Sequence, residues 1–263
     1  MQPSLFSDQW RLIVLIVACT LLWSVESFKP LNDYAKDRFR RAVPNMGLTA
    51  LLIATNLSLS FATAQLVAFI QVHEFGLFFF LSLSPWVCLI LGVVALDLFA
   101  YVGHFLLHKS WLGWQFHRVH HSDREVNVTT AFRQHPGESL WRMFCQVLAV
   151  VVFGLPLEVV AVYLTISALN AQLEHANIKV NGSLDGWLRL LVVTPNMHKV
   201  HHSREQIETD TNYSNIFSIW DRIFGTYTPT VDFKRLRYGL DGFDNREKQT
   251  LAALLKLPFV HEM

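Results

Sequence analysis

A run of 25 residues without a charged side chain, Met46 to Ile70, constrains this chain more than any other sequence feature. An α-helix needs about 20 apolar residues to cross the roughly 30 Å hydrocarbon core of a bilayer. Leu12 to Val25 is shorter but also uncharged, and Pro85 to His108 is apolar apart from Asp97 and its histidines. Charged residues make up 16% of the chain, against about 25% in soluble domains. These patterns predict an integral membrane protein.

The part of the chain that follows these runs predicts a helical hairpin. Leu140 to Phe153 and Leu157 to Leu173 are apolar, but each is short for a full crossing, and a Gly-Leu-Pro sequence separates them. We expect a hairpin that dips into the membrane, with two buried helices of a soluble core as the alternative. Phe78 to Ser84 is expected to lie in the membrane interface. The predicted fold is an all-α integral membrane protein with three to four membrane helices and this hairpin.

The distribution of Lys and Arg predicts the orientation in the membrane, because short cytoplasmic loops carry an excess of these residues. The loop from Phe28 to Pro44 contains five of them and Gln71 to Gly76 contains none. The five are Lys29, Lys36, Arg38, Arg40 and Arg41. The first loop is therefore expected in the cytoplasm, together with everything after His108. The membrane is a bacterial inner membrane or the endoplasmic reticulum, and three N-glycosylation sequons, at Asn127, Asn181 and Asn212, should stay unmodified.

Eight of the twelve histidines fall into three short motifs. These are HFLLH (His104, His108), HRVHH (His117, His120, His121) and HKVHH (His198, His201, His202). Helical residues three and four positions apart share a face, so each motif can present its imidazoles together. A single histidine is usually an ordinary core residue, but two HxxHH motifs are improbable by composition. Eight imidazoles are too many for one tetrahedral zinc ion and suit two metal ions with four ligands each. Imidazole binds iron, copper and zinc alike.

Other functional classes fit the sequence less well. The three cysteines lie in apolar stretches and predict neither a disulfide framework nor a cysteine-rich metal site. A net charge of +1 lacks the basic excess of nucleic-acid-binding proteins. A metal transporter would place its ligands near the middle of the membrane. An intramembrane metalloprotease would need the motif H-E-x-x-H, but the His73-Glu74 pair is not followed by a second histidine at the required position.

The histidine motifs and their surroundings resemble the membrane-bound fatty acid hydroxylase and sterol desaturase superfamily. The similarity runs roughly from Leu89 to Tyr227. It includes the blocks Asp97–Ser110, Phe116–Ser122, Arg133–Glu138, Thr194–Ser203 and Asn212–Tyr227. The hydrophobic pattern predicts N-terminal membrane helices in residues 1–84 and an interfacial tail in residues 231–263. The resemblance implies that residues 85–230 form a hydroxylase-like catalytic domain, which contains the cytoplasmic, helical, histidine-rich metal domain. The three parts are expected to form one structural unit.

The resemblance also implies a chemistry. Members of this superfamily use two iron ions and dioxygen to oxidise C–H bonds of lipids, and zinc is a possible substitute for the iron. We therefore expect a lipid hydroxylase, with a desaturase using the same metals as the alternative. A non-redox membrane metal-binding protein is a more distant alternative. The substrate would be a membrane lipid, and the electrons would come from a separate reductase, ferredoxin or cytochrome.

Several further residues are candidates for the metal site. His175 lies where members of the superfamily often supply another ligand, whereas Ala171 stands where relatives carry a further histidine. Asn177 could then bind a water molecule at the position left open. His135 is expected to orient a ligand through its second ring nitrogen, with direct ligation as the alternative. The carboxylates expected to accept N–H bonds from ligand histidines or to pair with arginines are Asp97, Glu138, Glu174 and Asp221.

The change from apolar to polar residues predicts how a substrate reaches these histidines. The apolar side chains that precede His104 and those of the hairpin should line a slot that opens to the bilayer. Leu164 is expected in this slot. Such a slot suits a lipid whose head stays in the interface and whose reacting carbon lies well along a chain.

Overall fold

The computed structural model describes residues 8–33, 38–229, 232–233 and 235–260. Within these ranges the regular secondary structure is helical, and the single β-bridge joins Val192 and Phe217. Three helices are long and apolar enough to cross a membrane. They are α1 (Asp8–Phe28), α2 (Arg38–Val72) and α4 (Pro85–Lys109). The all-helical membrane fold expected from the sequence is therefore confirmed.

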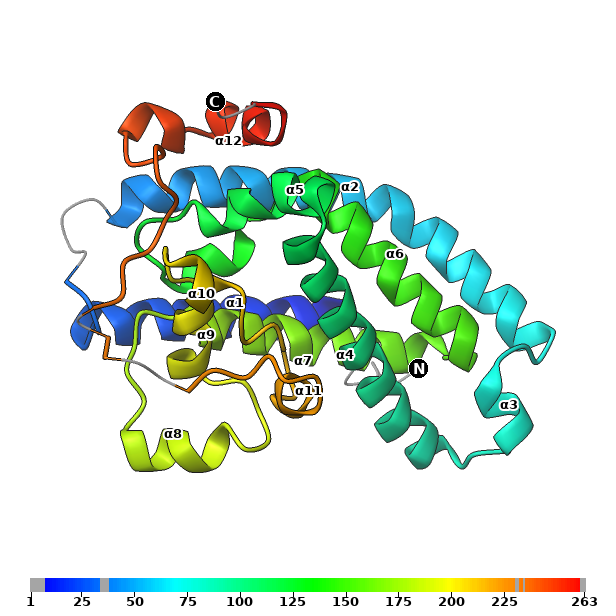
Figure 1. Ribbon diagram of the computed structural model, residues 1–263. Helices are drawn as coiled ribbons and strands as arrows, with labels where there is room; N and C mark the ends of the chain where they lie inside the picture. Colours follow the sequence, from blue (N-terminus) through cyan, green and yellow to red (C-terminus); the bar gives the residue numbers. More distant parts are fainter. Residues whose placement is uncertain (1–7, 34–37, 230–231, 234, 261–263) are drawn as a thin grey trace.

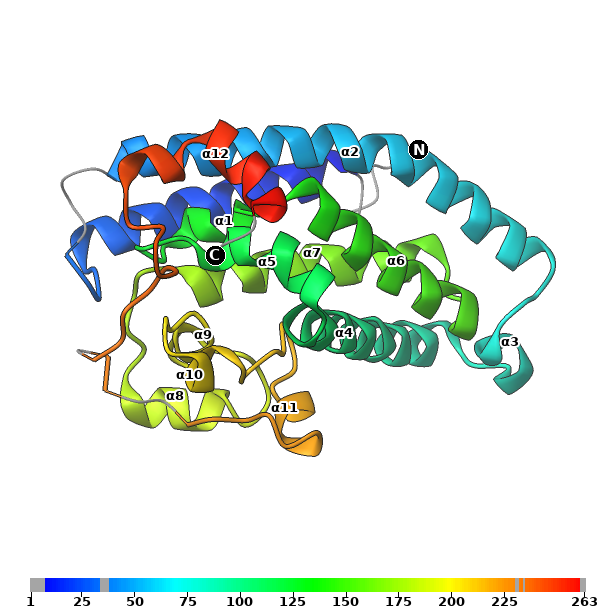
Figure 2. The ribbon, with the colours of Figure 1, turned by 45° about the horizontal axis from the view of Figure 1, so that its top comes forward.

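The remaining helices follow in chain order. The short α3 (Leu77–Leu81) precedes α4, and α6 (Pro136–Phe153) with α7 (Leu157–His175) forms the expected hairpin. The others are α5 (Trp111–His121), η2 (Val128–Phe132), α8 (Gly182–Leu188), α9 (Pro195–His201), α10 (Gln206–Thr209), α11 (Ile219–Ile223), η3 (Arg246–Gln249), α12 (Leu251–Lys256) and η4 (Leu257–Phe259). In Figures 1 and 2 the short helices α8 to α11 gather at one end of the long ones.

A tight turn joins the two helices of the hairpin. Gly154 ends α6 with a φ of 73°, in the left-handed region that favours glycine. A Cβ atom at this position would also lie 2.5 Å from the carbonyl oxygen of Phe75. Pro156 then precedes the first turn of α7. The hairpin packs on α2 and α4 around a core that includes Leu96, Ala149 and Tyr163.

The start of α2 differs from the expectation that residues up to Pro44 form a loop. The helix begins at Arg38 and continues through Pro44. Proline removes one backbone hydrogen bond from a helix, and here that loss falls within the first two turns. The earlier start is stabilised by Arg38, which lies 2.5 Å from Glu26 and 3.7 Å above the ring of Trp23. Lys36, one of the basic residues of this loop, lies outside the described residues.

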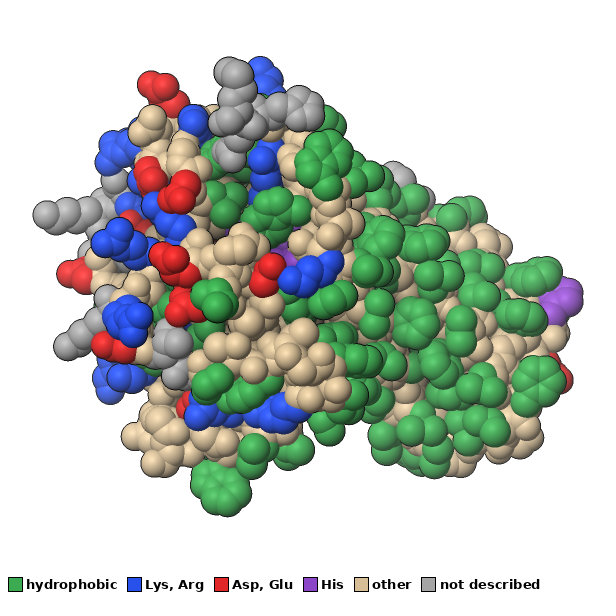
Figure 3. Space-filling model, viewed as in Figure 1, with side chains coloured by type: hydrophobic (Ala, Val, Ile, Leu, Met, Phe, Trp, Pro, Cys, Tyr) green, Lys and Arg blue, Asp and Glu red, His purple; other side chains and the backbone are tan. Residues whose placement is uncertain are grey.

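The surface of the molecule has two different ends (Figure 3). Hydrophobic side chains cover the right-hand end of this view, whereas Lys, Arg, Asp and Glu gather at the left-hand end, around the short helices. Among the described side chains of α1, only Glu26 is buried. Apolar side chains exposed over whole helices are stable in lipid and are a liability in water. This surface fits a protein whose hydrophobic end is embedded in a membrane.

Candidate metal centre

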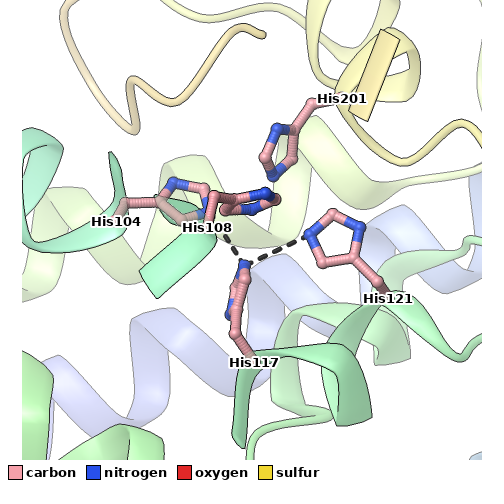
Figure 4. Close-up of side chains that lie close together, drawn as sticks. All are labelled: His104, His108, His117, His121 and His201. Carbon is pink, nitrogen blue, oxygen red and sulfur yellow. Dashed lines mark hydrogen bonds between the residues drawn. The ribbon is translucent and has the colours of Figure 1, made fainter. Parts of the chain in front are cut away.

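Five histidines from three helices form a first group (Figure 4). His104 and His108 come from α4, His117 and His121 from α5, and His201 from α9. One nitrogen of each lies within 4.8 Å of the corresponding nitrogen of every other member. All five side chains are buried. Their rings point toward a common centre in Figure 4, which is an arrangement that can hold a metal ion.

Four more histidines form a second buried group. They are His120 of α5, His175 at the end of α7, His198 of α9, and His202, which directly follows α9. Nε2 of His175 lies 3.1 Å from Nε2 of His120 and 3.0 Å from Nε2 of both His198 and His202. His175 is thus the central member of this group.

The two groups divide each HxxHH motif between them. In HRVHH, His117 and His121 belong to the first group and His120 to the second. In HKVHH, His198 and His202 belong to the second group and His201 to the first. Helical residues are about 100° apart around the axis, so residues i and i+4 diverge by about 40° while i+3 and i+4 diverge by about 100°. The i and i+4 histidines of each motif accordingly lie in the same group, and the i+3 histidine lies in the other. The expectation of one shared face and four ligands per ion is therefore replaced by groups of five and four.

The distances between these nitrogens match those around a metal ion. Nitrogens bound at about 2.1 Å to one ion lie about 3.0 to 3.4 Å apart at tetrahedral or octahedral angles. Nε2 of His117 lies 3.0 Å from that of His104 and 3.2 Å from that of His121. Nε2 of His108 and of His201 are buried and have no hydrogen-bond partner among the described residues. Because buried nitrogens need a partner, the first group fits a metal ion. The second group fits one by its distances, since Nε2 of His175 lies 3.0 to 3.1 Å from the other three.

Backbone carbonyl groups hold several of the rings in the correct tautomer. Nδ1 of His104 donates to the carbonyl oxygen of Tyr213 at 2.7 Å, and Nδ1 of His201 donates to Thr211 at 2.7 Å. In the second group, Nδ1 of His175 donates to Ala171 at 2.6 Å. A carbonyl oxygen only accepts, so Nδ1 carries the proton. In a neutral ring the lone pair of Nε2 then faces the centre of the group, as metal binding requires.

Carboxylates lie behind other rings. Glu138 Oε1 lies 3.0 Å from Nδ1 of His117 and accepts a bond of 2.7 Å from Nε of Arg142. Asp210 Oδ1 lies 3.4 Å from Nδ1 of His108. Such partners orient ligand histidines and increase their basicity. Glu174 lies farther away, at 3.8 Å from Nδ1 of His175.

Burial keeps these imidazoles neutral. It lowers the pKa of His121 well below its usual value, and repulsion from His202 and other neighbouring histidines lowers it further. Burial has the same effect on the pKa of His198 and His201. Neutral imidazole is the form that binds metals, so the site does not have to lose protons before an ion enters.

The structure places four of the other candidates outside both groups. Nδ1 of His135 accepts from the backbone N–H of Gly137, and Nε2 donates to the carbonyl oxygen of Leu255. The side chain of Asn177 bonds to the backbone of Asn32. Asp97 accepts from the backbone of residues 216 and 217 and from the indole of Trp220. Asp221 likewise accepts from the backbone of residues 213 and 214. These side chains hold the loops around the centre.

Residues that the sequence did not single out also support the centre. Asp210 and Tyr213 lie against the first group, and the Tyr213 ring lies 5.0 Å from that of His108. Lys199, within the second HxxHH motif, is fully buried and donates to the carbonyl oxygen of Ala176 at 2.6 Å. Burial lowers the pKa of Lys199 to about 7. The sequence signal that could have indicated that Asp210 and Tyr213 contact the first group is their position shortly after HKVHH.

Comparison with known proteins shows that the chain is similar to proteins named as lipid hydroxylases and monooxygenases. The sequence model of the fatty acid hydroxylase family matches residues 89–226. Human alkylglycerol monooxygenase is 34% identical over 188 residues, which are 70% of this chain and 40% of that protein. Ornithine lipid hydroxylase of Rhizobium tropici is 31% identical over 52% of this chain and 41% of its own length. Methylsterol monooxygenase 2-2 of Arabidopsis thaliana is 30% identical over 49% of this chain and 48% of its own length.

These matches define how far the similarity extends. The chain covers less than half the length of these curated relatives, and no solved structure gives a significant match. The family match, however, covers more than half of the chain and contains all nine clustered histidines. The chain therefore belongs to the fatty acid hydroxylase family.

Proposed function

We propose that this protein is a membrane lipid hydroxylase that binds two iron ions through nine histidines. The observation that carries the proposal is the pair of buried imidazole groups at one end of helices that can cross a membrane. The ligand residues are His104, His108, His117, His120, His121, His175, His198, His201 and His202. A pair of iron ions would supply the redox chemistry by which dioxygen oxidises a C–H bond. Zinc binds the same ligands but supplies no redox chemistry.

The protein's own part in this reaction is to hold and shield the ligands. Carbonyl groups and Glu138 fix the tautomers described above, and burial excludes water from both groups. A dry site prevents side reactions of the oxidant. Lipid is the proposed substrate because the named relatives act on alkylglycerols, ornithine lipids and methylsterols. Desaturation with the same metals remains the second candidate.

Two adjoining cavities lead from the membrane-facing helices to residues beside the histidines. The inner cavity, of about 300 Å³, includes Gly103 and Ala171, which lie next to His104 and one helical turn before His175. The outer cavity, of about 680 Å³, lies between α1, α2, α6 and α7. Met143, Gln146 and Leu164 line both cavities. Together they have the size of a typical small-molecule site, and this continuity supports lateral access of a lipid chain.

The cytoplasmic face is the proposed location of the metal centre. The basic residues at the start of α2 lie at the same end of the molecule as the histidines, and basic loops are typically cytoplasmic. A separate reductase, ferredoxin or cytochrome in the cytoplasm would supply electrons. We therefore expect activity to depend on an added electron donor.

Metal analysis combined with a lipid oxidation assay tests this proposal. The purified protein should contain about two metal ions per chain, because its ligands form two groups. Iron-loaded protein with dioxygen and a reducing system should add oxygen to a membrane lipid. Removal of the iron with a chelator should abolish turnover, and iron should restore it. One ion per chain, or turnover that survives removal of the metal, would contradict the proposal.

A substitution in the shared wall of the cavities tests lateral access. Leu164→Asn places a polar group where a lipid chain would pass, and it should lower the kcat/KM for a long-chain lipid by about tenfold. Metal content should not change, because Leu164 is not among the clustered histidines. Leu148→Asn is the matched control, since Leu148 is 39% exposed and lines neither cavity. Equal losses in both variants would argue against this path.

A further inference from the structure

The inner cavity is more polar than a passage for a hydrocarbon chain needs to be. Residues from α2, α6 and the segment before α6 bring amide, hydroxyl and guanidinium groups to its wall. They are Asn56, Gln134, Ser139, Arg142 and Gln146. The outer cavity is lined mainly by apolar residues of α2, α6 and α7, such as Leu57, Val147 and Val160, although Arg11 and Glu158 also line it. Polar groups lining a cavity have a cost unless a ligand or water pairs with them.

Arg142 is the most informative of these residues. Its Nε donates to Glu138 at 2.7 Å, while Nη1 and Nη2 find no acceptor among the described residues. The side chain is 26% exposed and lines the inner cavity. Arg142 therefore offers hydrogen-bond donors to a cavity whose wall also includes Gly103, the neighbour of His104. The amide of Gln146 likewise has no partner among the described residues and lines the same cavity.

The charge of this cavity indicates which ligand it suits. Arg142 is the only charged residue among those that line it, and the buried carboxylate of Glu138 balances its charge. A phosphate or carboxylate group would have to compete with Glu138 for the same guanidinium. Hydroxyl and ether oxygens can accept from Nη1, Nη2 and the Gln146 amide without bringing a second negative charge. The lining thus favours an uncharged, oxygen-containing group.

The depth of the cavity agrees with this assignment. His104 lies five residues before the end of α4, which corresponds to about 8 Å along a helix. This depth is close to the interface, where lipid head groups lie. The inner cavity borders α2 at Leu52 and Asn56, and the outer cavity continues along this helix from Leu57 to Ala64, farther from its basic start. A lipid that placed its head in the inner cavity would extend its chain into the outer one. The carbon beside the histidines would then belong to the head region.

Building on the proposed function, we propose that Arg142 and Gln146 form a subsite that binds the hydroxyl or ether oxygens of an uncharged lipid. The subsite presents a carbon within a few bonds of those oxygens to the metal centre. This differs from the sequence-based expectation of a reacting carbon well along the chain. Arg142 acts in two ways, because it binds the substrate and holds Glu138 against His117.

Binding of three probe lipids to the full-length protein tests the subsite without relying on turnover. The protein is placed in lipid nanodiscs, both metal-loaded and after treatment with a chelator. The probes are 1-O-hexadecylglycerol, hexadecyl methyl ether, which lacks the hydroxyls, and 1-O-hexadecylglycerol 3-phosphate, which is charged. The glycerol ether should bind about tenfold more tightly than the methyl ether, because hydrogen bonds to a charged donor contribute strongly. It should also bind more tightly than the phosphate.

Two variants and one control connect this preference to the residues. Arg142→Met and Gln146→Leu should each reduce the preference for the glycerol ether at least about threefold. Gln146→Leu leaves the pair between Arg142 and Glu138 intact, so its metal content and unfolding temperature should not change. Arg189→Met is the control, since Arg189 forms a comparable i,i+4 pair with Asp185 and lines neither cavity.

The outcomes separate this inference from the proposed function. An unchanged preference in both cavity variants, or tightest binding of the phosphate, would overturn the subsite. Turnover of lipids without any preference for the glycerol ether would also overturn it and leave the hydroxylase proposal standing. The expected binding pattern in a protein that oxidises no lipid would support the subsite and contradict the hydroxylase proposal.

Discussion

Helices α1 and α9 reverse the usual distribution of residues between the inside and outside of a protein. Every residue of α9 is buried, including His198, Lys199 and His201. Helix α1 is apolar along most of its length, and only Glu26 is buried among its described side chains. In soluble proteins, lysine is almost never fully buried unless it is paired. The contrast shows that the two helices are adapted to different surroundings.

The surroundings of each helix explain the reversal. The polar groups of α9 find partners inside the protein, such as the carbonyl oxygens of Ala176 and Thr211. The surface of α1 has few polar groups to satisfy and suits the hydrocarbon of a bilayer, where all backbone groups must be paired within the helix. Burial in this protein therefore follows the availability of partners for polar groups. Four changes test this comparison.

Loss of one clustered histidine should have the largest effect. His120→Ala removes a ligand of the second group and should reduce the metal content from about two ions to one or fewer. Activity should fall at least about a thousandfold, to the background level. Metal analysis and the lipid oxidation assay measure both quantities. His73→Ala is the control, because His73 is exposed and lies outside both groups. Full activity of His120→Ala would show that the buried histidines are not ligands.

A charge in the middle of α1 should have the next largest effect. Val17 is 50% exposed, and Val17→Lys should disfavour membrane insertion of this helix by about 2.5 to 3.5 kcal/mol. Fractionation of cells and an insertion assay would measure the loss. Phe28→Lys, at the end of the helix, should have a much smaller effect because its amine reaches the interface. Equal insertion of the two variants would mean that α1 does not cross the membrane.

A change behind a ligand should have a smaller effect than loss of the ligand itself. Glu138→Gln keeps an oxygen near Nδ1 of His117 but removes the negative charge. Metal affinity should fall about 10- to 100-fold, as measured by competition with a chelator. Glu158→Gln on α7 should leave affinity unchanged, because Glu158 lies outside both groups. No change in Glu138→Gln would mean that the carboxylate does not support the site.

A test of orientation should leave activity untouched. Of the three sequons, Asn127 and Asn212 are buried and Asn181 is exposed, so only Asn181 can report which side of the membrane it occupies. Expressed in a eukaryotic host, the protein should carry no glycan there, and Asn181→Gln should not change its mobility on a gel. A glycosidase-sensitive shift that disappears in Asn181→Gln would place the histidines on the lumenal side.

The sequence predicted the features that depend on local pattern. Uncharged runs located the long helices, and histidine spacing located the residues that the structure brings together. The division into five and four was not predicted, because a spacing rule treats i+3 and i+4 as one face and neglects the 100° between neighbouring residues. The partners of Nδ1 are backbone carbonyl oxygens, for example that of Tyr213. Every residue has such an oxygen, so no sequence pattern can indicate which one lies close.

The sharing of α5 and α9 between the two histidine groups has a consequence for the order of assembly. An ion bound by either group would draw the two helices together and align the remaining ligands, since both helices contribute to both groups. The first ion would thereby lower the conformational entropy that the second must overcome. Loading would then be positively cooperative, and half-filled molecules would be scarce during titration with metal. A chain built in this way avoids accumulating a species with one redox-active ion and an empty neighbouring position.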